Sequence, residues 1–139
     1  MLHTKERLSE VSNDALLAQL RSLVARERRI TLGVLLLLNE VERRGIHRER
    51  YSSLFSYCTD ILGYSKSAAG RRIAAARCLR RFPRVRRMLE TGELNLTTVC
   101  ILARVMRPDN VDELLRQARG CGQEQAEELA AKHGAPERR

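Results

Sequence analysis

The residues most able to do chemistry form a cationic face in the segment 65–81. At the helical spacing of about 100° per residue, one arc of this segment holds only small, polar or cationic side chains: Lys66, Ser67, Gly70, Arg71, Ala74 and Arg77. Ammonium and guanidinium groups bind phosphate oxygens, and guanidinium also pairs with the edge of guanine. The small residues on the arc allow a helix to approach a groove closely. The spacing therefore predicts a surface for a nucleic acid, with a solvated basic face as the alternative.

The other arc of this segment is small and apolar, with Ala69, Ile73 and Ala76. An apolar arc must be buried against neighbouring elements, so the segment belongs to a core as well as to a surface. One helix is expected to serve both purposes.

The stretch that begins at Ser53 and precedes this segment is expected to form a helix. Together the two helices would make a helix-turn-helix over 53–81. Gly63 suits the left-handed position after a helix end, and Ser65 can cap the next helix, so we expect a turn over 62–65. Three- and four-residue spacing predicts one buried apolar face on the first helix: Leu54, Phe55, Cys58, Ile61 and Leu62.

A second basic segment follows Pro83, which favours a helix start, and ends at Gly92. Its arginines either extend the phosphate-binding surface or face water. The motif and this segment together supply the expected DNA contacts: Tyr64, Ser65, Lys66, Ser67, Arg71, Arg72, Arg77, Arg84, Arg86 and Arg87.

The charge of the chain is concentrated around this surface. The formal net charge is +9 over 139 residues, and residues 63–107 carry 11 Lys+Arg against 2 Asp+Glu, which is +9. Residues 1–62 carry 10 against 8, or +2, and residues 108–139 carry 5 against 7, or −2. A localised excess of this kind indicates a polyanionic partner, and we expect double-stranded DNA.

A long helix is expected over 12–45, from the caps Ser12-Asn13-Asp14 to Gly45. It either bends near 28–31 or pairs with a second copy. Its run Ile30 to Leu38 is apolar on every face and should be buried all round, by a homodimer or inside a monomer core. The run is about half a membrane span, so no membrane is expected. His47, in the loop that follows, is expected to be solvated.

The length, the helical periodicities and the lack of a strand pattern predict an all-α fold, with the single helical domain covering 1–139. Later helices should begin near Asn95, after Pro108 and at Glu124, and Gly120 should end one of them. Aromatics make up only 4% of the chain, so Leu, Ile, Val and Ala must build the core.

Catalysis has little support in the residue types. The 4 cysteines lie about twenty residues apart without a C-x-x-C pair, and only 3 histidines occur. This spacing argues against a zinc site, and no Gly-rich phosphate loop or paired carboxylates are visible. We expect no enzyme activity, no metal and no small-molecule cofactor, with reduced thiols in the cytoplasm.

Residues 53–131 resemble the central DNA-binding domain of the ParB/KorB partition proteins. The matching stretches are GYSKSAAGRRI and FPRVRRMLETGELNLTTVCILARVM, followed by a short helix that ends in ELAAKHG. The resemblance implies a helix-turn-helix with supporting helices. The nucleotide-binding part of ParB has no counterpart here, so its chemistry is not implied.

The whole chain also resembles the helical region that precedes HNH nuclease domains in a bacterial family, through LLAQLRSLVARERRITLGVLLLLNEVERRG and YSSLFSYCTDILGYS. No His-Asn-His cluster follows. The two resemblances imply a bacterial, nucleoid-associated DNA-binding protein, a small transcriptional or partition-type regulator. The alternatives are the DNA-targeting domain of a nuclease without its catalytic part, and a basic protein-interaction module.

Overall fold

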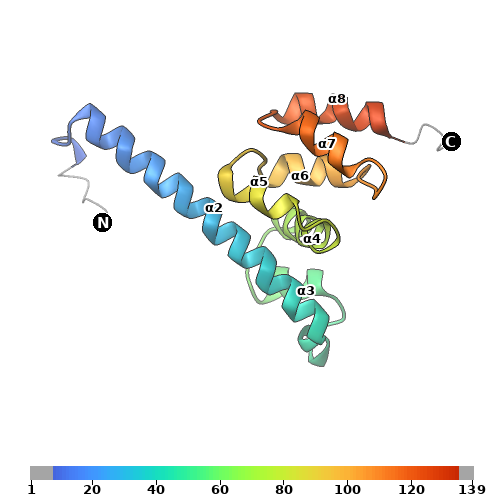
Figure 1. Cartoon of the computed structure of the whole chain (residues 1–139). Helices are drawn as coiled ribbons and strands as arrows, with labels where there is room; N and C mark the ends of the chain where they lie inside the picture. Colours follow the sequence, from blue (N-terminus) through green and yellow to red (C-terminus); the bar gives the residue numbers. More distant parts are fainter. Residues whose placement is uncertain (1–7, 135–139) are drawn as a thin grey trace.

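The computed structural model describes residues 8–134, which form an all-α domain without a strand in that range. The long helix α2 comes first, a 3-10 turn η1 follows, and six shorter helices complete the domain (Figure 1). The bounds are α2 Asn13–Arg44, η1 Ile46–Glu49, α3 Leu54–Asp60, α4 Lys66–Arg81, α5 Val85–Thr91, α6 Leu96–Ala103, α7 Val111–Ala118 and α8 Gln123–His133. The all-α prediction is confirmed.

Helix α2 is a single continuous helix of 32 residues. Ser12 caps its start by accepting a hydrogen bond from the backbone N–H of Ala15 at 3.2 Å. Gly45, at φ 69°, ends it in the left-handed conformation that glycine adopts at little cost. Both ends are where the sequence predicted them, and the helix runs unbroken through 28–31, so the alternative of a bend there is wrong.

Helix α4 lies at the centre of the domain and packs against α2, α3, α5 and α6. Its buried residues are small or of moderate size: Ala69, Ile73, Ala75, Ala76, Cys78 and Leu79. Because alanine side chains are short, helix axes can approach one another closely at these positions. Figure 1 shows α2 crossing α4 on one side, with α6, α7 and α8 stacked on the other.

The apolar run of α2 is not buried all round. Leu32, Leu35 and Leu38 enter the core, whereas the side chains of Ile30 and Leu37 are 68% and 69% exposed. The helix meets the rest of the domain along one side, and its first turns project beyond every other helix (Figure 1). The prediction of all-round burial, including burial inside a monomer core, is therefore wrong for the single chain.

His47 also departs from its prediction. It lies in η1 and is only 6% exposed, not solvated. Its backbone oxygen accepts hydrogen bonds from the N–H groups of Arg50 and Tyr51, so the turn is folded over this residue.

None of the helices described over residues 8–134 is long and apolar enough to cross a membrane.

Candidate nucleic-acid interface

The helix-turn-helix begins with a capping box at the start of α3. Ser53 Oγ accepts from the backbone N–H of Ser56 at 3.0 Å, and Ser56 Oγ accepts from the backbone N–H of Ser53 at 3.4 Å. Such reciprocal caps fix where a short helix begins. The second helix, α4, begins at Lys66 as predicted, because Ser65 Oγ accepts from Ala68 N–H at 3.1 Å.

The turn between α3 and α4 is longer than the sequence predicted. Helix α3 ends at Asp60, because the N–H groups of Ile61 and Leu62 both donate to the carbonyl of Tyr57 and close the helix early. Gly63, at φ 81°, then reverses the chain within the left-handed region, as expected of it.

The early end of α3 explains a second correction. Of the five apolar residues predicted to form one buried face, only Leu54 and Cys58 are buried. Ile61 and Leu62 have left the helix and its spacing, and Phe55 lies about a quarter turn from Leu54. All three are exposed, which leaves an apolar patch beside the turn.

The cationic arc of α4 faces solvent at its N-terminal half. Lys66, Ser67 and Arg71 are exposed, and neither cation forms an ion pair within residues 8–134. Gly70 has no atom within 4 Å of the position of an added Cβ, so the backbone is open to a ligand there. This part of α4 is free to contact a polyanion.

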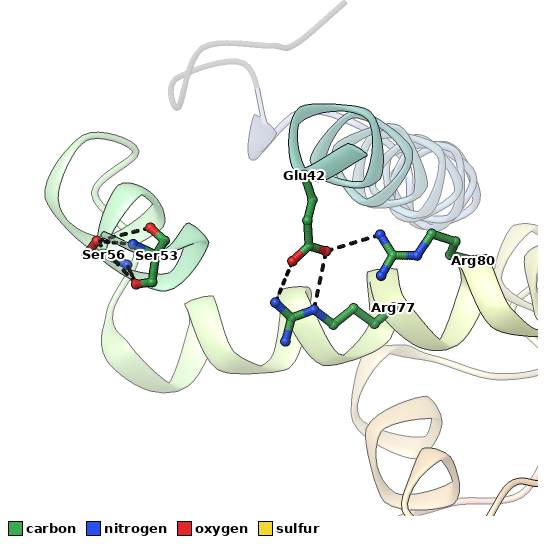
Figure 2. A network of polar contacts seen from close by, with 5 residues as sticks. All are labelled: Glu42, Ser53, Ser56, Arg77 and Arg80. Atoms are coloured by element: carbon green, nitrogen blue, oxygen red, sulfur yellow. Dashed lines mark hydrogen bonds and ion pairs between the residues drawn. The ribbon is translucent and has the colours of Figure 1, made fainter. Parts of the chain in front are cut away.

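Arg77 lies on the same arc, but its guanidinium forms an ion pair within the chain. Its Nη2 and Nε lie 2.5 and 3.3 Å from the carboxylate oxygens of Glu42 on α2, and Arg80 Nη1 reaches the same carboxylate at 3.2 Å. Figure 2 shows both guanidinium groups turned toward Glu42, where α2 crosses α4. The hydrogen bond from Arg77 holds the pKa of Glu42 below its usual value, and that of Arg77 is raised in return.

Two further residues predicted to contact DNA, Tyr64 and Arg72, instead contact each other within the chain. The guanidinium of Arg72 lies over the ring of Tyr64, 4.6 Å from its centroid, and donates to the carbonyl of Ala68 at 3.2 Å. This cation–π contact ties the turn to the first part of α4. Tyr64 and Arg72 thus shape the motif, and Ser65 caps it.

The three arginines of the α5 region, Arg84, Arg86 and Arg87, differ in the contacts that they make. Arg84 forms an ion pair with Asp112 at the start of α7. Arg87 lines a groove with Glu93 and lowers the pKa of that carboxyl, behind the larger effect of Arg119. Arg86 is exposed and forms no ion pair within the described range. Arg87 is likewise exposed without an ion pair in that range, so of the three only Arg84 is held by a carboxylate partner.

Sequence reasoning missed Arg81 and Glu42. Arg81 follows Arg77 by four residues and is exposed, with its guanidinium over the ring of Phe82 at 4.8 Å. It lines the shallow groove between α4 and α6 together with Ala74. Helical spacing would have found Arg81. The role of Glu42 depends on a contact 35 residues away in the sequence, for which no local signal exists.

The face is long enough to cross a groove of duplex DNA. At 1.5 Å per residue, Lys66 and Arg81 are about 22 Å apart along the axis of α4, against a major groove about 12 Å wide.

No protein-family model, curated protein or solved structure matches this chain. The resemblances to ParB/KorB and to the HNH-associated region remain predictions. Within residues 8–134, no three His, Cys, Asp or Glu side chains are grouped closely enough to hold a metal ion.

Proposed function

We propose that this protein binds double-stranded DNA through the exposed face of α4. The observation that carries the proposal is the open N-terminal half of that helix, where Lys66 and Arg71 form no ion pair in the described chain and Ser65 caps the start. In a helix-turn-helix, this end of the second helix is the part that reaches base edges.

The residues divide into two groups by their position. We assign base contacts to Arg71 and Ser67, which are exposed in the first half of α4, because arginine is the commonest partner of guanine. We assign phosphate contacts, which give affinity without sequence information, to the exposed cations Lys66, Arg81 and Arg86. The proposal thus assigns sequence readout to the middle of the face and electrostatic attraction to its margins.

Fluorescence anisotropy on duplex DNA over a salt series tests this division. Replacing Arg71 with Ala should cost about 1–3 kcal/mol of binding free energy on a selected site and relax specificity at one position. Replacing Arg86 with Ala should weaken all sequences alike and lower the salt slope by about one unit.

Arg116→Ala is the matched control, because Arg116 lies on α7 and already pairs with Glu113. It should bind DNA as wild type does. The proposal fails if wild type shows no salt-dependent binding to any duplex, or if Arg71→Ala binds as tightly as Arg116→Ala. Either result would assign the basic face to solvent or to an acidic protein.

A further inference from the structure

An exposed apolar stripe with a seven-residue repeat runs the length of α2. One set of positions is Leu16, Leu23, Ile30 and Leu37, and a second set, offset by four residues, is Leu20, Glu27, Val34 and Val41. Seven of these eight positions are apolar, and the repeat continues over four heptads. This is the pattern by which two α-helices pair in a coiled coil.

The stripe adjoins the side of α2 that meets the core, and its positions Val34 and Val41 pack against the core from the edge of that side. Leu32, Leu35 and Leu38 fill the core, whereas the side chains of Leu16, Leu20, Ile30 and Leu37 are between 42% and 69% exposed. Leu23, Val34 and Val41 are partly buried. No element described over residues 8–134 covers the exposed positions, and the first turns of α2, before Val24, stand clear of the domain (Figure 1).

We propose that the stripe binds the same stripe of a second copy of this chain, as a two-helix coiled coil. A seven-residue period fits a helix as occupant, and α2 supplies that helix at matching length. Residues 13–44 carry 6 arginines and 4 acidic residues, a net +2, so two copies of α2 repel each other little. The basic residues 63–107, by contrast, carry +9 and would oppose association through their own surface.

Glu27 sets the orientation of the pair. In a parallel, in-register pair every stripe residue meets its own counterpart, so two Glu27 carboxylates would be brought together in an apolar seam. An antiparallel pair that overlaps along the whole stripe sets Glu27 against Ile30 of the second copy, and Leu20 against Leu37 of the second copy. The coiled coil is therefore antiparallel. This inference does not depend on DNA binding.

Sedimentation equilibrium without DNA tests the dimer. Wild type should show about twice 15.9 kDa at tens of micromolar, and Ile30→Glu/Leu37→Glu should be a monomer with unchanged helicity by circular dichroism. Ala15→Glu/Ser22→Glu is the control, because it adds the same charges at the same spacing to exposed positions off the stripe and should remain a dimer. A monomeric wild type, or a dimeric Ile30→Glu/Leu37→Glu, overturns the proposal.

Oxidative cross-linking tests the orientation in a Cys100→Ser/Cys121→Ser background. Leu20→Cys with Leu37→Cys on the same chain should give a disulfide-linked dimer, whereas Leu20→Cys alone should not. Linkage through Leu20→Cys alone would show a parallel pair and overturn the orientation. Absence of linkage in the double variant would overturn the register.

Discussion

Glu42 and Arg77 form a bidentate ion pair between α2 and α4, with Oε2 and Nη2 2.5 Å apart. The carboxylate is mostly covered, whereas the guanidinium is about half exposed and lies on the face proposed to meet DNA. In the free protein, Glu42 therefore pairs with one arginine of that face, Arg77, and also with the nearby Arg80.

Replacing Glu42 with Gln should increase the affinity for duplex DNA by roughly 1 kcal/mol, or about fivefold, because it removes a negative charge and releases Arg77 and Arg80. Anisotropy at one fixed salt concentration measures the change. Glu40→Gln is the control, since Glu40 pairs with Arg43 and Arg44 on its own helix and contacts neither α4 arginine. Equal affinities for the two variants would contradict the prediction.

The free energy of unfolding should fall as the pH drops below about 4.5. Hydrogen bonds from arginines lower the pKa of Glu42, Glu93 and Glu113 in the folded chain, and Arg43 and Arg44 lower that of Glu40 to about 2. A carboxyl with a depressed folded-state pKa adds stability above its unfolded pKa and loses it as the pH falls through the folded value. Urea unfolding at pH 7, 5 and 3 measures the loss. Stability that is equal at pH 5 and pH 3 would contradict it.

Gly92→Ala should lower the free energy of unfolding by about 1–2 kcal/mol, because the residue is in the left-handed conformation. Its φ is 85°, and an added Cβ would lie 3.1 Å from the guanidinium carbon of Arg28 on α2. Gly70→Ala is the matched control within α4, where φ is ordinary and the space is open. That change should stabilise the protein by roughly 0.5–1 kcal/mol. Thermal unfolding of both variants measures these changes. A Gly92→Ala variant as stable as wild type would contradict the prediction that this position is strained.

Labelling with a thiol reagent at pH 8 should separate the cysteines. Cys58 and Cys78 are buried, and burial raises the pKa of both thiols, that of Cys78 to about 11. They should react only after unfolding in urea. Burial also raises the pKa of Cys100 and Cys121, but these two thiols are only half-buried, so they should be modified slowly in the native state. Mass spectrometry after timed quenching identifies the sites. Rapid modification of Cys78 in the native protein would contradict the assignment.

Local signals predicted most helix ends correctly. Ser12, Ser65 and Asn95 cap helices where their side chains suggested, and Gly45 and Gly92 end helices in the left-handed conformation. Capping depends on residues within one turn of each other, so the sequence contains what is needed. The end of α3 was misjudged because backbone hydrogen bonds to the carbonyl of Tyr57 close that helix before its glycine.

The sequence did not allow the same kind of prediction for which side chains are buried or which distant residues form ion pairs. Periodicity shows that α2 has apolar residues on several sides, but not which side meets the domain, so Ile30 was expected inside and lies outside. Arg77 belongs to the expected cationic arc, yet its ion pair depends on how α2 crosses α4. Contacts between distant segments are a product of the fold, and no spacing rule along one helix contains them.

The projecting first turns of α2 have a consequence for how the helix is held together. The first turns of α2, before Val24 lines a cavity with Leu89 and Leu94, span about ten residues, which is shorter than the length at which an isolated helix survives in water. In a lone chain, the amide hydrogens of residues 13–23 should therefore exchange with solvent far faster than those of residues 32–44, which lie against the core. In a paired helix, both halves would exchange slowly. If α2 pairs as proposed, helicity in this arm becomes a function of protein concentration, and dilution should unwind one end of the molecule while leaving the face of α4 intact.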